Sequence, residues 1–159
     1  MDDPDAVDVI LRAAPDERPR PGRAFLGDDA VLFAPGRHGR LARAVGGAAD
    51  GLFGGLLESL GLYDPHAVTR TEATHDPDAV RVRYGDVEGL APFARPTGFS
   101  LHLRVAGRED DVRLAFRSAD ERADAVSLAR ELRRRARAAG ADPEVVDPGG
   151  RTRVLSLEE

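Results

Sequence analysis

Residues 80–139 read VRVRYGDVEGLAPFARPTGFSLHLRVAGREDDVRLAFRSADERADAVSLARELRRRARAA. Apolar and polar residues alternate at 80–84, 100–105 and 112–116. A period of two is typical of strands that have one face on a core and the other in water. The polar residues 107–110 separate the last two runs, as the turn of a hairpin does. We therefore expect a strand in each run.

The same stretch ends in a predicted helix over residues 118–139. Ser118 and Glu121 match the S-x-x-E capping box at its start. Acidic residues crowd the first turn and arginines the last two, which complements the helix dipole. Gly140 suits a C-terminal cap. One apolar stripe would face the core: Ala125, Leu128, Ala129, Leu132 and Ala136.

The pattern upstream of residue 64 is less regular. Apolar residues of 3–14 (Val7, Ile10, Leu11 and Ala14) have helical spacing, so residues 1–21 are interpreted as an N-terminal helix and a proline-rich connector. Residues 23–26 and 30–34 flank Gly27-Asp28-Asp29, which predicts a hairpin. Residues 36–63 mix glycine with leucine, and a short helix or helical pair is expected there.

Valine and threonine in residues 66–74 predict another strand. Residues 141–159 are rich in proline and glycine and are interpreted as a loose tail, in which 153–157 would add a short edge strand. The length of 159 residues fits one domain, and we expect residues 1–159 to form it.

Composition limits the classes of function. The hydrophobic content of 42% is that of a globular chain, and the absence of cysteine excludes disulfides and thiolate zinc sites. Charged residues make up 32%, the net charge is −5, and all 23 basic residues are arginine. Such an acidic, lysine-free surface would suit high salt, as in a halophile. The net negative charge argues against a general nucleic-acid or anionic-membrane binder.

The order of these patterns resembles the prokaryotic pleckstrin-homology-like family, including its GRAM-type members. Its first strand pair would be GRAFLGDDAVLF at 22–33, and its turn would be Tyr84-Gly85-Asp86-Val87. Its later strands would be GFSLHL at 98–103 and LAF at 114–116, before the helix. Residues 22–34 and 80–139, about half the chain, carry the resemblance.

The resemblance implies an α+β fold that is mainly β. It would be an antiparallel barrel of about seven strands, closed by the C-terminal helix, with residues 36–63 as a glycine-rich helical insertion. It also implies a non-catalytic binding module and not an enzyme. We expect no cofactor. The family's phosphoinositide site uses Lys and Arg in the first hairpin, whereas the turn here is the acidic Gly27-Asp28-Asp29, which argues against phosphoinositide binding.

Two groups of residues are candidate binding sites. Arg81, Arg83, His102 and Arg104 lie on polar strand faces and would bind an anion if their strands are neighbours; otherwise they form a solvated, ion-paired face. The apolar residues of the insertion would contact a partner or a membrane if exposed, or would fold over the barrel as a satellite core; they are Leu52, Phe53, Leu56, Leu57 and Leu60.

Other chemistry has little support. His66 and His75 lie near several aspartates but lack helical zinc spacing, so a solvated turn is favoured and no metal is expected. The arginine-rich residues 130–137 could touch nucleic acid or acidic lipid, but the helix dipole already explains them. We find no motif of a hydrolase, P-loop or dinucleotide enzyme.

We therefore expect a non-catalytic adaptor for a protein partner or for self-association. The alternatives are peripheral membrane association through the insertion, and anion or nucleic-acid binding on an arginine-rich face. The first residues, Met1-Asp2-Asp3-Pro4-Asp5, do not look like a signal peptide, and no apolar run is long enough to span a membrane. A cytoplasmic location is expected, with peripheral membrane attachment as the alternative.

Overall fold

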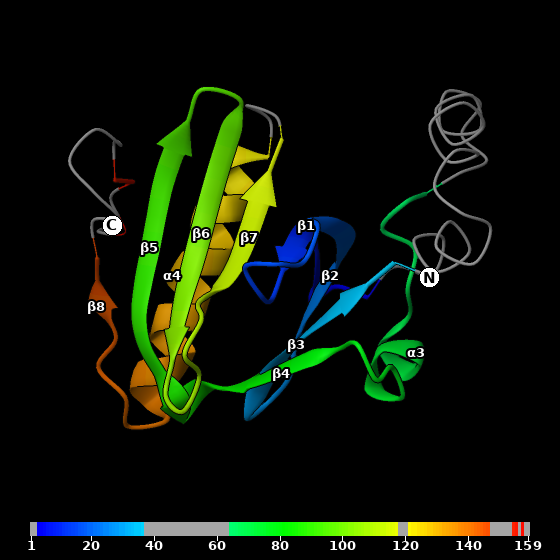
Figure 1. Cartoon of the computed structure of the whole chain (residues 1–159). Helices are drawn as coiled ribbons and strands as arrows, with labels where there is room; N and C mark the ends of the chain where they lie inside the picture. The colour runs from blue at the N-terminus through cyan, green and yellow to red at the C-terminus, as the bar shows by residue number, and fades with distance from the viewer. Residues whose placement is uncertain (1–2, 37–63, 118–120, 147–153, 156, 158–159) are drawn as a thin grey trace.

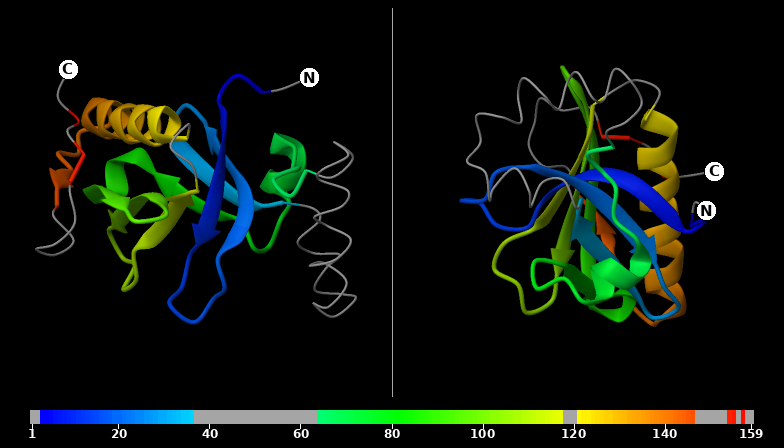
Figure 2. Two further views of the ribbon diagram at one scale, coloured as in Figure 1. Left: turned by 90° about the horizontal axis from the view of Figure 1, so that it is seen from above. Right: turned by 90° about the vertical axis from the view of Figure 1, so that its right-hand side faces the viewer.

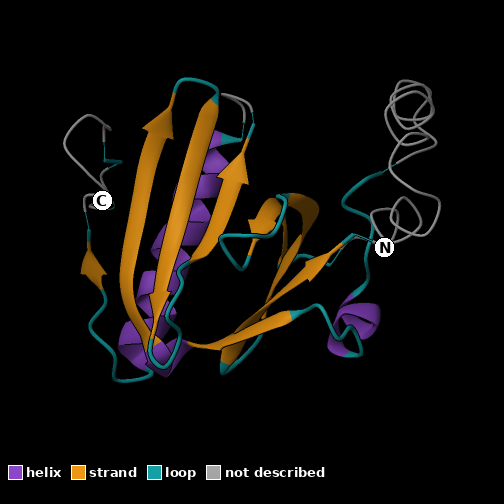
Figure 3. Cartoon of the chain, in the orientation of Figure 1, coloured by secondary structure: helices purple, strands orange, loops and turns teal. Residues whose placement is uncertain are grey.

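The computed structural model describes residues 3–36, 64–117, 121–146, 154–155 and 157. Its elements are β1 (Ala6–Arg12), β2 (Arg20–Leu26), β3 (Ala30–Pro35), α3 (Arg70–Thr74), β4 (Val80–Arg83), the 3-10 turn η2 (Tyr84–Asp86), β5 (Val87–Arg95), β6 (Gly98–Val105), β7 (Val112–Phe116), α4 (Arg122–Ala138) and β8 (Glu144–Val145). Strands outnumber helices among the described residues (Figures 1 and 3), so the mainly-β α+β class is confirmed. The insertion predicted at 36–63 lies outside the described residues, apart from Gly36.

The strands form one eight-stranded sheet in the order β4-β3-β2-β1-β7-β6-β5-β8. Neighbours are antiparallel except β5 and β8, which run parallel. The predicted hairpin and the predicted strands at 80–84, 100–105 and 112–116 are confirmed as β2–β3, β4, β6 and β7. In the described part of the chain β4 and β8 are the free ends of an open sheet. A closed seven-stranded barrel therefore stays a prediction.

The helix α4 lies along one face of β5, β6 and β7, which we call the inner face (Figure 2). The predicted apolar stripe is confirmed: Ala125, Leu128, Ala129, Leu132 and Ala136 are at most 3% exposed. They share one apolar cluster with Leu101, Leu103 and Leu114 of the strands. Phe33 of β3 and Leu11 of β1 belong to the same cluster, so the core extends under the first half of the sheet.

The predicted N-terminal helix is wrong, because residues 6–12 form β1 between β2 and β7. Val9 and Leu11 point into the core and are each 1% exposed, while Ile10 points to the opposite face and is 7% exposed. Val9, Ile10 and Leu11 are all buried although they alternate between the two faces, so the apolar residues of β1 form a continuous run. The period of such a run does not distinguish a strand from a helix.

The predicted strand at 66–74 is also wrong, because Arg70–Thr74 form the short helix α3. Thr69 caps it: the Thr69 hydroxyl accepts from the Glu72 amide at 3.2 Å, and the Glu72 carboxylate accepts from the Thr69 amide at 2.8 Å. This reciprocal capping box overrides the strand preference of valine and threonine. Ala73 packs with Phe25 in a second apolar cluster on the side of the sheet away from α4.

Strand β5 was not predicted, since Pro92 breaks the pattern of residues 87–95. The carbonyls of Leu90 and Pro92 accept from the amides of Val146 and Leu155, at 2.8 and 2.9 Å. Amide and carbonyl of one strand residue point to the same side, so the missing amide of Pro92 faces the short C-terminal segments and not β6. Gly98 then begins β6 at φ +143°, where a Cβ would meet the carbonyl oxygen of Phe116.

The helix α4 begins at Arg122, later than predicted, and Glu121 precedes it without a side-chain cap. The Glu121 carboxylate accepts from the Arg117 amide at 2.8 Å, and the predicted cap Ser118 lies outside the described residues. The C-terminal cap is confirmed. Gly140 has φ +87°. The Gly140 amide donates to the Arg137 carbonyl and the Ala141 amide donates to the Ala136 carbonyl. Together these bonds form a Schellman motif.

The described tail residues are not loose. Val154 makes an antiparallel bridge with Phe93 of β5, and Leu155 and Leu157 are 5% and 7% exposed. Of the predicted edge strand at 153–157, the described residues 154, 155 and 157 form this single bridge. These contacts cover the outer edge of β5, which would otherwise present unpaired backbone groups to solvent.

Candidate functional site

The face of the sheet opposite α4 carries a group of basic side chains, which we call the outer basic face. Figure 1 views this face from the front, with α4 behind β5, β6 and β7. Because alternate strand residues point to opposite faces, the leucines of these strands enter the core while the residues between them point outward. The outer basic face consists of Arg12 of β1, Arg95 of β5, His102 and Arg104 of β6, and Arg113 of β7.

Strand register places three of these groups in a row. Arg12 lies opposite Arg113, and Arg113 lies opposite His102. Like charges directly opposite each other on neighbouring strands destabilise a sheet. Within the described residues neither Arg113 nor Arg104 forms an ion pair. The row therefore places the guanidinium groups of Arg12 and Arg113 opposite each other, and neither has an ion-paired carboxylate among the residues that the structure describes.

Arg12 and Arg95 are held by neutral oxygen atoms. The Arg12 guanidinium donates to the carbonyls of Ala14, at 3.3 Å, and Pro15 in the connection after β1. The Arg95 guanidinium donates to the Ser100 hydroxyl at 3.5 Å. Ser100 points outward but is only 2% exposed. These contacts orient the guanidinium groups without neutralising their charge.

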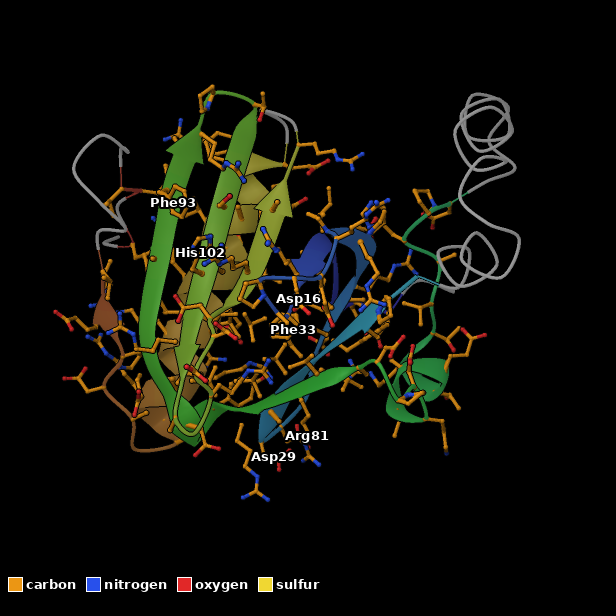
Figure 4. All side chains as sticks on the ribbon, viewed as in Figure 1. Asp16, Asp29, Phe33, Arg81, Phe93 and His102 are labelled. Carbon is orange, nitrogen blue, oxygen red and sulfur yellow. The ribbon has the colours of Figure 1, made fainter. Side chains whose placement is uncertain are left out.

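His102 lies at the centre of this face, and Figure 4 shows it beside Phe93 of β5. The two rings meet edge to face, with centroids 4.9 Å apart and an interplanar angle of 88°. Burial lowers the pKa of His102, and the neighbouring Arg113 and Arg95 lower it further, while Asp111 opposes them. The imidazole is therefore mainly neutral near pH 7 and can both donate and accept a hydrogen bond.

A pair of open hollows adjoins His102 and Arg113. The first, of about 290 Å³, has Ile10, Phe93 and Ala115 in its lining and Arg12, Arg95 and Arg113 around it. The second, of about 380 Å³, is lined by residues that include Ala91, Arg104 and Asp111. The first hollow combines an apolar floor with a cationic rim, whereas Asp111 makes the second one mixed in charge.

The predicted anion site is brought together only in part. His102 and Arg104 lie on the outer face of β6, but β4, which carries Arg81 and Arg83, is at the far end of the sheet. Arg81 pairs there with Asp29 at 2.9 Å, and Figure 4 shows both away from His102. The assumption that β4 neighbours β6 was wrong, because β3, β2, β1 and β7 lie between them.

Sequence reasoning missed Arg12, Arg95 and Arg113. Arg113 alternates with core residues of a predicted strand, so the hairpin that joins it to His102 could have revealed it. Arg12 was assigned to a helix and Arg95 to no element. The predicted contact residues of the insertion, Leu52, Phe53, Leu56, Leu57 and Leu60, lie outside the described residues, and membrane association through them stays a prediction that liposome flotation would test.

The arginine-rich end of α4 is occupied by contacts within the chain. Glu131 binds Arg134 at 2.5 Å and Arg135 at 2.6 Å. The hydrogen bond from Arg134 is the main reason why the pKa of Glu131 falls to about 2. Arg135 also donates to the carbonyl of Gly27 and lies over the Tyr84 ring. Such internal pairing leaves this helix end less suited than the outer basic face to bind an anion.

The histidines considered for a metal site make local contacts. The His66 Nδ1 lies 2.9 Å from the Gly22 carbonyl, and the His75 Nδ1 lies 2.9 Å from the Thr71 carbonyl. The described residues contain no group of His, Asp or Glu side chains arranged to hold a metal ion. They also contain no helix of the length and hydrophobicity needed to cross a membrane.

Comparison with known proteins gives a likeness of fold. No family model and no curated protein matches the sequence. Among solved structures, the chain is similar to the hSac2 domain from the human phosphoinositide phosphatase Sac2, with a TM-score of 0.52 and 12% sequence identity. The match covers 96% of this chain and 78% of that one. At this identity the likeness concerns the arrangement of the strands and the helix, and not the chemistry of the outer face.

Proposed function

We propose that the chain is a non-catalytic, pleckstrin-homology-like binding module that holds an acidic segment of a partner protein on its outer basic face. The observation that carries the proposal is the row Arg12–Arg113–His102 across β1, β7 and β6. The like charges of Arg12 and Arg113 disfavour the free protein, and a bound carboxylate would relieve that repulsion. Guanidinium and imidazole groups are also suitable hydrogen-bond donors for carboxylates.

The resemblance of the sequence to the pleckstrin-homology-like family supports a binding role. The open sheet with one long helix agrees with that resemblance in outline, and closure of the strands into a barrel is part of the proposal. A protein partner is favoured over a lipid headgroup because the first hairpin turn, Gly27-Asp28-Asp29, is acidic. The concentrated positive face of a chain whose net charge is −5 would also select partners by charge complementarity.

Fluorescence anisotropy with a dye-labelled, glutamate-rich peptide tests the proposal. The substitution Arg113→Gln should weaken binding about tenfold, because it removes a charged hydrogen bond. Arg83→Gln is the matched control: Arg83 is another exposed strand arginine, on β4 at the far end of the sheet. Binding should weaken as salt is raised. Equal weakening by both substitutions, or no binding by the wild type, would contradict the proposal.

A further inference from the structure

The outer face of the sheet has a second row of side chains beside the charged one. Ile10 lies opposite Ala115, Ala115 lies opposite Ser100, and Ser100 lies opposite Phe93. The second row lies two positions away from the charged row along each strand. Ile10, Ala115 and Ser100 are two residues from Arg12, Arg113 and His102, respectively. Phe93 is two residues from Ala91, which lies opposite His102. The rows are therefore roughly 7 Å apart, since a strand rises about 3.3 Å per residue.

The second row explains the shape of the first hollow. Its central positions, Ala115 and Ser100, have small side chains, while Ile10 and Phe93 at the ends are larger. Ile10 and Phe93 are each 7% exposed although they point away from the main core. The result is a hollow of about 290 Å³ with an apolar floor, which lies at the small end of ligand pockets, at about 300–1,000 Å³. One side chain would fit it better than a large cofactor.

The charges around the hollow restrict what can enter it. Arg12 and Arg113 lie on one side, two positions along their strands from Ile10 and Ala115, and the Arg95 guanidinium reaches the Ser100 hydroxyl in the second row. Asp111 belongs to the second hollow, where it would repel a carboxylate. A small hydrated anion would use the cationic row but leave the apolar floor in contact with water. A ligand with both an apolar group and a carboxylate would use both rows.

We infer that the preferred ligand is an extended peptide segment in which an apolar residue and an acidic residue are separated by one residue. This inference rests on the proposed function and names its ligand class. Side chains at positions i and i+2 of an extended chain point to the same side and are roughly 7 Å apart. The apolar side chain enters the first hollow while the carboxylate meets Arg113 and Arg12. Adjacent positions would point to opposite sides and could not reach both rows.

The test uses dye-labelled peptides of identical composition in fluorescence anisotropy. In the spaced peptide, glutamate and phenylalanine alternate with a single serine between them. In the adjacent peptide, glutamate and phenylalanine are neighbours in the sequence. We expect the spaced peptide to bind about tenfold more tightly than the adjacent one. A third peptide, with glutamine in place of glutamate, should not bind measurably, and phosphatidylserine vesicles should not compete with the spaced peptide.

Filling the hollow gives an independent test on the protein. Ala115→Leu should abolish the preference for the spaced peptide while leaving a glutamate–serine peptide without phenylalanine unaffected. Ala106→Leu, which adds the same group at an exposed position after β6, is the control. Circular dichroism and urea unfolding establish that each variant is folded. Ala115→Ser, which keeps the hollow open, should retain the preference.

The outcomes separate the inference from the proposed function. If both phenylalanine peptides and the glutamate–serine peptide bind alike, and Ala115→Leu changes nothing, the inference is wrong while the acidic partner stands. If no acidic peptide binds, or if vesicles bind through Arg113 and peptides do not, both are overturned. Spacing-dependent binding that Ala115→Leu abolishes and Ala106→Leu preserves would establish the inference.

Discussion

The inner and outer faces of β5, β6 and β7 are made by alternate residues of the same strands, yet they differ in kind. On the inner face Leu101, Leu103 and Leu114 are at most 1% exposed beneath α4. On the outer face Arg113 of β7 lies opposite Arg12 of the neighbouring strand β1, so that two positive charges face each other. The inner face gains free energy from burial, whereas the outer face accepts a local repulsion. The contrast indicates that the inner face maintains the fold, and it is the basis for proposing the outer face as a binding surface.

The largest expected effect is on the inner face. Leu132→Ala should lower the free energy of unfolding by about 2–5 kcal/mol, because the residue is 0% exposed between α4 and the sheet and its loss leaves a cavity. Urea unfolding followed by circular dichroism measures it. Arg104→Ala on the outer face is the control and should change stability by at most about 0.5 kcal/mol. A loss below about 1 kcal/mol for Leu132→Ala would mean that α4 does not close the core.

A smaller effect is expected at the polar margin of the core. Tyr84 is 1% exposed and its hydroxyl donates to the Gly27 carbonyl at 3.0 Å. Tyr84→Phe should cost about 1 kcal/mol, since it removes one hydrogen bond while Arg135 still donates to the same carbonyl. The same unfolding assay measures it. No change in stability would show that this bond makes no net contribution beyond that of Arg135.

The outer face should make stability depend on pH through His102. Because burial and then Arg113 lower the pKa of His102 from 6.5 in the folded protein, the unfolded chain binds the proton more tightly. The contribution to stability is therefore fully present above the unfolded pKa and is lost as pH falls below it. Urea unfolding between about pH 8 and pH 5 should show a smaller decline for His102→Asn than for the wild type. Identical declines would contradict the lowered pKa.

The smallest effect concerns the repulsion itself. Arg113→Gln should raise the free energy of unfolding by about 0.2–0.5 kcal/mol, since it removes a like charge opposite Arg12. The gain should shrink in high salt, where charges are screened. Arg83→Gln should show no such gain. If Arg113→Gln destabilised the protein instead, the row would not be a strained cationic cluster, and the contrast between the two faces would lose its basis.

Secondary structure was predictable for strands and helices that have one face toward the core and the other toward solvent. Residues 100–105 and 112–116 alternate because one face is buried, and the stripe of α4 is regular for the same reason. The prediction failed for β1, where Val9, Ile10 and Leu11 are buried in succession, and for β5, whose Pro92 directs its missing amide to the sheet edge. For α3 the prediction was wrong although the sequence contains a recognisable helix signal, the capping box of Thr69 and Glu72.

From the sequence, the candidate site was predictable only for residues that belong to the same strand. Alternation within β6 already placed His102 and Arg104 on a polar face. Grouping them with Arg81 and Arg83 required the order of the strands, which alternation does not contain. Tertiary structure separated those residues and brought Arg12 and Arg113 to His102 instead.

The sequence by itself determined the outward direction of His102 and the apolar stripe of α4, because both follow from the local geometry of a strand or a helix. Only the tertiary structure decided which arginines surround His102 and that Ile10 and Phe93 form the floor of a hollow. Those contacts join residues from separate parts of the chain, and their register depends on how every intervening strand packs. Local chemistry therefore defines the faces of this protein, and long-range pairing assembles the candidate site on one of them.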